Sequence, residues 1–293
     1  MPNIPPICSK QIPENNNPLL VADEIASFQK TIWDYFNERG RSFSWRQTQN
    51  PYHIVVSEVM LQQTQTFRVA PKYEQFIAAF PDFQTLATAQ FSEVLRYWKG
   101  LGYNRRALNL QKLAQEVMHK FGGILPTIPE IIDEFPGIGP ATASSICAFA
   151  FNAPSVFIET NIRAVYIHFF FQGKEKVHDS EIRPFVELTL DKENPRLWYY
   201  ALMDYGVMLK KMYPNPSRKS AHHTTQTKFE GSDRQIRGMI LQSLLESPKL
   251  SLIDLFSLIN REPTRIERIL YELCKENLVI SKNNFFHLPG TLK

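Results

Sequence analysis

Residues 124–163 constrain the fold of this chain more than any other stretch. Their sequence, ILPTIPEIIDEFPGIGPATASSICAFAFNAPSVFIETNIR, predicts two short helices joined by a turn that contains Gly137 and Gly139. Pro136 ends the first helix, and Pro140 suits the first turn of the second, because the N–H that proline lacks would have no helical partner there. The stretch therefore predicts two helices joined by a glycine hairpin.

Both ends of this joint carry further signals. Glu130 follows Thr127 at the spacing of a capping box, which predicts that the first helix starts at Thr127. Beyond the hairpin, the free N–H groups at the start of the second helix point the same way and can hold a phosphate oxygen. The local sequence leaves two interpretations open, a plain structural joint and a phosphate-binding hairpin.

The apolar pattern elsewhere predicts a main body built from α-helices alone. No sustained strand alternation occurs before residue 280, and no internal repeat is present. Helical spacing of apolar residues predicts helices at 19–37, 53–65, 70–80, 84–88, 91–98, 106–121, 160–171, 180–190 and 194–212.

Changes in composition divide the chain into four segments. Residues 1–18, rich in proline and asparagine, predict an irregular N-terminal arm before a helical domain at 19–212. Residues 213–232 are polar and basic, which predicts a long loop. Residues 233–293 predict three helices, then a strand, an Asn-Asn turn and a second strand, which outlines a winged-helix module or, equally, a small helical packing domain. The three helices are expected at 233–246, 251–259 and 263–276.

Composition and charge exclude several classes of protein. The three cysteines, Cys8, Cys147 and Cys274, are too scattered for a disulfide framework or a zinc site, which fits a reducing compartment. There is no run of 18 apolar residues and no signal-peptide pattern, so we expect an intracellular protein of the cytoplasm or nucleoid without a membrane segment. The formal net charge of +4 permits a polyanionic partner without requiring one.

Two carboxylates stand out against apolar surroundings. Glu58 shares a helix face with Ile54 and Leu61, and burial there is expected to raise its pKa, as a general acid requires. An edge position, where the carboxylate reaches solvent or an arginine, is the alternative. Glu159 follows an apolar run in VFIETNIR, where an acidic residue also suits a helix start. Neither residue alone decides between these interpretations.

The conjunction of motifs is more specific than any one of them. SEVMLQQTQ (57–65), WKGLGYNRRALNL (98–110), the PGIG hairpin and an acid-x-Asn about twenty residues later resemble the helix-hairpin-helix DNA glycosylase superfamily. Within it, the chain resembles the MutY-type adenine glycosylases over roughly residues 28–212. The resemblance implies an all-α fold of two helical lobes with a cleft between them, followed here by the small winged-helix-like module.

The resemblance implies roles for the two carboxylates. Glu58 matches the glutamate that protonates the adenine ring and turns the base into a leaving group. Glu159 matches the position of an aspartate that faces the deoxyribose and stabilises the positive charge that develops there, and Asn161 matches the asparagine beside it. Such an arrangement is analogous to the carboxylate pair of glycosidases.

Further residues match positions that contact DNA in the family. Gln63 and Thr64 match residues that approach the base opposite the target, and Leu101 lies in a loop that helps them. Gly137, Ile138 and Gly139 match a hairpin whose backbone N–H groups hold a phosphate, often with the help of a monovalent cation. Ala141 stands where bifunctional relatives have the Schiff-base lysine, so we expect hydrolysis by water and no strand cleavage through that position. The DNA-contacting positions are Gln63, Thr64, Leu101 and its loop neighbour Tyr103, Gly137, Ile138, Gly139 and Ala141.

The chain also departs from the family in three ways. The family usually has aspartate where this chain has Glu159, and a misplacement near 1 Å can cost on the order of 10²-fold in rate. Iron–sulfur ligands are missing, since Lys210 and Lys211 follow Leu209 where the first cysteine would fall. No cofactor is therefore expected, and no metal ion apart from the monovalent cation at the Gly137–Gly139 hairpin. Arg218 and Lys219 of the basic loop are expected to contact the DNA backbone instead, unless the loop is merely solvated. The last 60 residues are too short and too helical for the family's 8-oxoguanine-recognition domain.

These features together predict a monofunctional DNA glycosylase. Its substrate is expected to be double-stranded DNA with a mispaired base, first of all adenine opposite 8-oxoguanine or guanine. A glycosylase for uracil, thymine, hypoxanthine or another lesion is one alternative, and a DNA-binding protein without catalysis is another. A monomer is expected.

Overall fold

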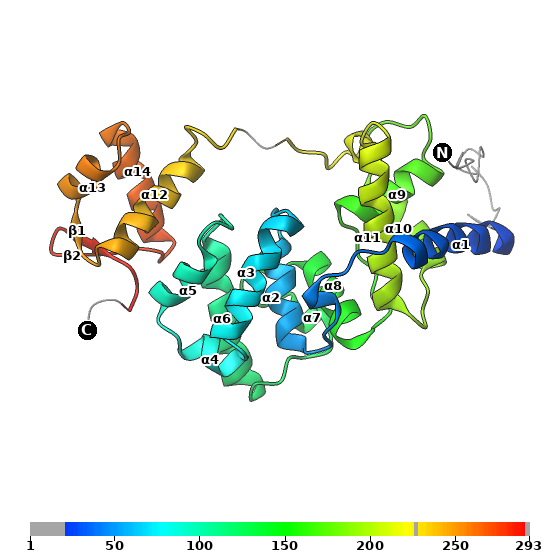
Figure 1. Ribbon diagram of the computed structural model, residues 1–293, viewed down its shortest axis with the longest axis horizontal. Helices are drawn as coiled ribbons and strands as arrows, with labels where there is room; N and C mark the ends of the chain where they lie inside the picture. The colour runs from blue at the N-terminus through cyan, green and yellow to red at the C-terminus, as the bar shows by residue number, and fades with distance from the viewer. Residues whose placement is uncertain (1–20, 226–227, 291–293) are drawn as a thin grey trace. The chain divides into compact units, whose positions relative to one another are not determined.

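The computed structural model describes residues 21–225 and 228–290, which form two compact units (Figure 1). The first unit comprises the residues up to Pro51 together with Thr127–Asp133 and Gly139–Thr225. The second comprises Tyr52–Pro126, Glu134–Ile138 and the residues from 228 onward. Each unit is thus assembled from segments that lie far apart in the sequence. The N-terminal arm expected at 1–18 lies outside the described residues.

The first unit is helical and is centred on the contact between α9 and α11. A Cβ atom at Gly206 of α11 would overlap the backbone carbonyl oxygen of Asn161 in α9, so the helices approach this closely only because residue 206 is glycine. The elements of this unit are α1 (Ala22–Arg39), η1 (Ser44–Arg46), α7 (Pro129–Ile132), α8 (Pro140–Phe151), α9 (Thr160–Phe170), α10 (Asp179–Thr189), α11 (Pro195–Met212) and η2 (Pro216–Lys219).

A buried ion cluster ties the loop after α1 to α11. The carboxylate of Asp204 is only 1% exposed, and it accepts hydrogen bonds from Arg46 at 2.8 and 2.9 Å and from Arg41 at 2.7 Å. Arg46 also lies 4.4 Å from the ring centroid of Tyr200. Burial alone would raise the pKa of Asp204, but the two guanidinium groups outweigh it and hold that pKa below its usual value.

The second unit begins with five helices. They are α2 (Pro51–Leu61), α3 (Thr66–Ala79), α4 (Phe83–Thr88), α5 (Phe91–Trp98) and α6 (Arg105–Phe121). Residues 134–138 of the glycine hairpin join this unit, and Phe135 makes an edge-on contact with Phe121 of α6 at 5.8 Å between ring centroids. The core is formed by the apolar faces of these helices, with Trp98 and Phe76 among its fully buried side chains.

The C-terminal module of the second unit contains the three helices and the closing hairpin expected from the sequence, in the order of a winged helix. Its elements are α12 (Asp233–Glu246), β1 (Leu250–Ser251), α13 (Leu252–Leu258), α14 (Pro263–Lys275), β2 (Ile280–Lys282) and β3 (Phe285–His287). The strands form an antiparallel sheet in the order β1-β3-β2. Asn283 and Asn284 make the turn with φ of 50° and 62°, which asparagine tolerates well. Strand β1 was not predicted, because two residues are too few to show alternation.

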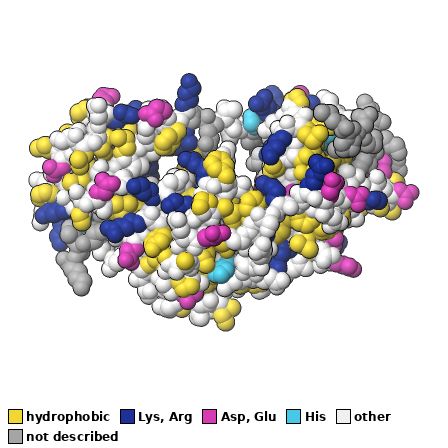
Figure 2. All heavy atoms as spheres, in the orientation of Figure 1, with side chains coloured by type: hydrophobic (Ala, Val, Ile, Leu, Met, Phe, Trp, Pro, Cys, Tyr) yellow, Lys and Arg dark blue, Asp and Glu magenta, His cyan; other side chains and the backbone are white. Residues whose placement is uncertain are grey.

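The surface of this module is mixed in charge. Figure 2 shows basic, acidic and hydrophobic side chains interspersed on the visible face of the module. On α14, both Arg265 and Arg268 pair with Asp233 of α12. The basic charges of α14 are therefore largely compensated by acids of the module.

The helix boundaries depart from the sequence predictions in two informative places. Helix α2 ends at Leu61 instead of residue 65, because Gln63 adopts a left-handed conformation with φ of 53°. Helix α7 is a single turn whose N-cap is Ile128, with no side-chain cap, so the capping box predicted at Thr127 is wrong. Among the described helices, none combines the length and apolar character needed to cross a membrane.

Candidate active site

The glycine hairpin needs glycine at residue 137 for two reasons. Gly137 has φ of 79°, and a Cβ atom there would lie 2.6 Å from Nδ2 of Asn109 in α6. Gly139 is the N-cap of α8 in an extended conformation, and Pro140 occupies the first helical position as predicted. Gly139 has no side chain with which to cap the first turn, so the N–H groups at the start of α8 suit an anion.

The other two predicted hairpin residues differ in their availability. Ile138 is buried, and its N–H donates to the carbonyl of Phe135 at 3.1 Å, so this amide already serves the turn. Ala141 is exposed in the first turn of α8. The hairpin thus presents Gly139 and the first turn of α8 outward, while Ile138 anchors the loop. The monovalent cation expected here stays a prediction.

Glu58 lies in the middle of α2, a helix with few exposed residues. Its neighbours Ser57 and Val59 are buried, whereas Glu58 itself is of intermediate exposure. The carboxyl group is therefore held on an apolar helix without being sealed from solvent, which a substrate-contacting acid requires. The raised pKa expected for Glu58 stays a prediction.

Arg106 connects the end of α2 to the loop between α5 and α6. Its guanidinium is buried and donates to the carbonyls of Val59, Met60 and Gln62 at 2.8, 2.9 and 2.6 Å. It also donates to the hydroxyl of Thr64 at 2.9 Å and to the carbonyls of Leu101 and Gly102 at 3.3 and 3.1 Å. Burial lowers the pKa of Arg106 to about 10, so the group stays charged at neutral pH.

Replacing Arg106 with methionine is expected to destabilise the second unit by at least about 2 kcal/mol, because several buried carbonyls lose their donor. The neighbouring residue Arg105 is exposed, so R105M is the matched control and is expected to change stability by less than about 0.5 kcal/mol. Chemical denaturation of both variants measures the difference. Equal stability of R106M and R105M would contradict this role.

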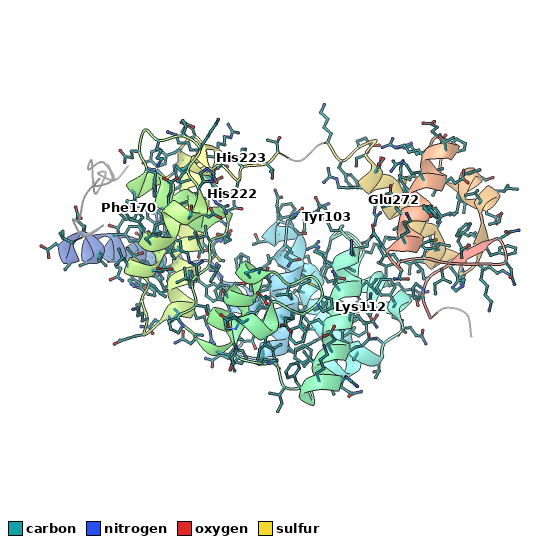
Figure 3. All side chains as sticks on the ribbon, turned by 180° about the vertical axis from the view of Figure 1, so that it is seen from behind. Tyr103, Lys112, Phe170, His222, His223 and Glu272 are labelled. Carbon is teal, nitrogen blue, oxygen red and sulfur yellow. The ribbon has the colours of Figure 1, made fainter. Side chains whose placement is uncertain are left out.

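The residues predicted near the opposite base lie around this arginine. Gln63 is exposed, and Thr64 is half-buried with its hydroxyl on Arg106. The side chain of Leu101, however, is only 3% exposed, so it packs in the core of the unit and does not project outward. Tyr103 is the exposed aromatic side chain of this loop, at 38% (Figure 3).

Tyr103 borders a cavity of about 570 Å³ in the second unit. Arg68 and Lys99 line this cavity from the helical part, and Phe229 and Arg234 line it from the C-terminal end of the chain. Arg234 donates to the Tyr103 hydroxyl at 3.2 Å, and its guanidinium lies 6.0 Å from the ring centroid. Cations combined with exposed aromatic rings are typical of surfaces that bind unpaired nucleotides.

In the first unit, Glu159 is the N-cap of α9, so the helix-start interpretation of this residue is confirmed. Its Oε1 atom accepts from the N–H groups of Asn161 and Ile162 at 2.7 and 2.9 Å, and its Oε2 atom accepts from Nδ2 of Asn161 at 3.1 Å. A carboxylate has about four acceptor sites, so a cap role leaves capacity for a ligand. Burial raises the pKa of Glu159, although the two amides, Lys210 and Arg163 act in the opposite direction.

The basic loop is ordered where it follows α11. Lys219 pairs with Glu175 at 3.3 Å, whereas Arg218 is exposed. Backbone bonds of 2.9 Å join Val177 to Lys219 and Ala221. His222 and His223 lie in the same segment (Figure 3), and within the described ranges no cluster of three metal-ligating side chains occurs.

Sequence reasoning missed three residues that organise these sites. Arg106 lies within LGYNRRALNL, a motif that was recognised without its physical reason. Asp204 lies in an apolar helix, the same signal that singled out Glu58. Lys210 donates from its Nζ atom to Oδ1 of Asn161 at 2.9 Å, and no local pattern indicates that contact.

Comparison with known proteins supplies the family. Residues 56–187 match the family described as HhH-GPD superfamily base excision DNA repair protein. This match spans Glu58, the glycine hairpin and Glu159. Residues 56–187 therefore form a domain of the helix-hairpin-helix base excision repair superfamily, in agreement with the motifs of the sequence.

The relatives of this chain include proteins named for different bases. The adenine DNA glycosylase of Buchnera aphidicola subsp. Baizongia pistaciae is 35% identical over 187 residues, which cover 62% of this chain and 52% of the relative. The thymine/uracil-DNA glycosylase of Methanothermobacter thermautotrophicus is 30% identical, covering 49% of this chain and 65% of the relative. The solved structure of a thermostable thymine-DNA glycosylase has a TM-score of 0.57 at 26% identity, covering 63% of this chain and 86% of that one. The chain spans about half the length of the first of these curated relatives.

Proposed function

We propose that this protein is a monofunctional DNA glycosylase that hydrolyses the bond between a mispaired base and deoxyribose in duplex DNA. Adenine opposite 8-oxoguanine or guanine is the proposed substrate. The observation that carries this proposal is the family match across residues 56–187, which takes in both carboxylates and the hairpin. The similarity to a protein named adenine DNA glycosylase supports adenine as the base that is removed.

The proposed chemistry uses one carboxyl group on each side of the bond that breaks. The target nucleotide is flipped out of the duplex at a cost of a few kcal/mol. Glu58 donates a proton to the base, which leaves with the electron pair of the N-glycosidic bond. Glu159 faces the sugar as a carboxylate and stabilises the developing positive charge until water adds to the anomeric carbon. With alanine at residue 141, no lysine at that position competes with water.

The surrounding residues have proposed roles in holding the DNA. The amides at Gly139 and the first turn of α8 hold a phosphate, because N–H groups and the helix dipole both favour an anion. Gln63 and Tyr103 lie next to the opposite base, and Arg218 contacts the backbone. These contacts predict binding that weakens steeply with salt.

The proposed enzyme works without an iron–sulfur cluster. Such clusters are held by cysteine thiolates. Cys147 is fully buried in α8, where burial raises its pKa to about 11, and Cys274 lies in α14 of the other unit. Residues 209–225, which follow the apolar part of α11, contain no cysteine. The residues present therefore do not fit a cluster.

Excision of thymine or uracil is the second candidate. It is favoured by the similarity to a thymine/uracil-DNA glycosylase and to the structure of a thymine-DNA glycosylase. A panel of duplexes that contain adenine, thymine, uracil or hypoxanthine opposite each partner base, 8-oxoguanine included, separates the two candidates under single-turnover conditions. Release of adenine supports the first, and release of only another base supports the second. DNA binding without release of any base would support a non-catalytic role instead.

The pH dependence of the reaction tests the part assigned to Glu159. Because burial raises the pKa of Glu159, its carboxylate form is lost at a higher pH than the roughly 4.3 of an unperturbed glutamate. The rate is therefore expected to fall with decreasing pH before that value is reached. Single-turnover rates measured from pH 4 to pH 8 check this expectation. A rate that stays constant down to about pH 4 would contradict the need for an ionised Glu159.

A further inference from the structure

Glu159 is connected to a lysine of a different helix through one side-chain amide. Lys210 Nζ donates to Oδ1 of Asn161 at 2.9 Å, and Nδ2 of Asn161 donates to Oε2 of Glu159 at 3.1 Å. An amide has one acceptor end and one donor end, so the bond from Lys210 fixes which end faces the carboxylate. Without the ammonium group, the amide oxygen would lose this donor, and Glu159 alone would set the orientation of the amide.

The packing of α11 against α9 holds Lys210 in place. Gly206, one turn before Lys210, allows the backbone of α11 to approach the carbonyl of Asn161 more closely than any side chain would permit. Lys210 is itself only partly exposed, and burial lowers its pKa while the charge of Glu159 acts to raise it. Each of these two charges therefore favours the ionised form of the other.

Most of the other charged groups near Glu159 have partners of their own, and Lys211 and Arg218 are exposed to solvent. Arg163 of α9 also faces Glu159 and lowers its pKa, but its guanidinium is held by Asp179 of α10 at 2.7 Å. Lys210 is thus the cation of this group that bonds to Asn161, and among the described residues it forms no ion pair with an acid. The other ion pairs are Lys174 with Glu181, Lys219 with Glu175, and Arg41 and Arg46 with Asp204. Of the histidines, His222 accepts a hydrogen bond from the N–H of Asp179, and the ring of His168 contacts Tyr213.

We propose that Lys210 is a positioning residue for the Glu159 carboxylate, orienting it through Asn161 and supplying the positive charge that keeps it ionised. The assignment rests on the proposed function, because it gives Glu159 its part in the reaction. Glu159, Asn161 and Lys210 form one hydrogen-bonded unit that joins α9 to α11.

The experiment compares K210M and K210Q with the unchanged protein, and K211M is the matched control because Lys211 is the exposed neighbour in the same helix. The titration of the Glu159 carboxyl is followed by ¹³C NMR, which requires no activity. In K210M and K210Q, we expect its midpoint to move up by about one pH unit, as the loss of a nearby opposite charge requires. The midpoint is expected to stay unchanged in K211M.

The single-turnover rate gives a second measurement. In K210M and K210Q, the pH below which the rate falls is expected to rise by the same amount, and in K210R it is expected to return to the value of the unchanged protein. A midpoint for Glu159 that is the same in all variants would overturn the proposal, whatever their activity. If the unchanged protein releases no base from any duplex, the proposed function fails, while the NMR titration still decides whether Lys210 controls Glu159. The two failures are therefore distinguishable.

Discussion

Replacing Glu58 with glutamine is expected to slow base release by about 10²–10⁴-fold, the usual contribution of a general acid. Glutamine has nearly the same shape as glutamate but cannot give up a proton to the leaving base. Because the two side chains match in shape, this substitution in α2 is expected to change the structure little. The loss should therefore appear in the single-turnover rate and leave the affinity for duplex DNA nearly unchanged.

The matched control for this prediction is E74Q. Glu74 is an exposed glutamate of α3 in the same unit, so its substitution removes one negative charge from the surface of the protein. E74Q is expected to keep the full rate. A rate for E58Q within a few-fold of that of E74Q would show that Glu58 is not the proton donor.

Replacing Asp204 with alanine is expected to lower the free energy of unfolding by about 3–5 kcal/mol. The substitution leaves Arg46, which is 9% exposed, without its partner and also removes two bonds from Arg41. The pKa of Asp204 is depressed in the folded protein, so its contribution is present above the pKa of the unfolded chain, about 3.9, and is lost as pH falls through the lower folded value.

Chemical denaturation at neutral pH measures this effect, with D34A as the control. Asp34 pairs with Lys30 on the surface of α1, where the two side chains are 62% and 74% exposed. Exposed pairs of this kind contribute about 0–1 kcal/mol, so D34A should be nearly neutral. Equal effects of D204A and D34A would mean that the buried cluster does not stabilise the first unit.

The fold could be predicted from this sequence to a large extent, because apolar periodicity and turn residues carry most of the information. Helix α12 was predicted at 233–246 and is found at Asp233–Glu246, and the Asn283-Asn284 turn lies where the hairpin was expected. The errors occurred where one residue overrides periodicity. Gln63 ends α2 early through its left-handed backbone, and Pro129 starts α7 two residues after the expected cap.

The candidate site could be predicted only in part. The position of Glu58 and Glu159 in apolar segments predicted them as candidate site residues, and the spacing of the glycines predicted the hairpin. The contact of Lys210 with Asn161 joins two helices, and such pairings between distant segments leave no local pattern in a single sequence. Leu101 shows the same limit, because its motif position did not reveal that its side chain is buried.

The most direct test of the proposed function identifies the molecule released from a duplex that contains adenine opposite 8-oxoguanine. Mass spectrometry of a single-turnover reaction is expected to find free adenine in amounts equal to the abasic strand, which breaks only after alkali treatment. The same reaction with E58Q should release none on that timescale. Strand cleavage without alkali, or an intact adenine strand after prolonged incubation, would contradict a monofunctional adenine glycosylase.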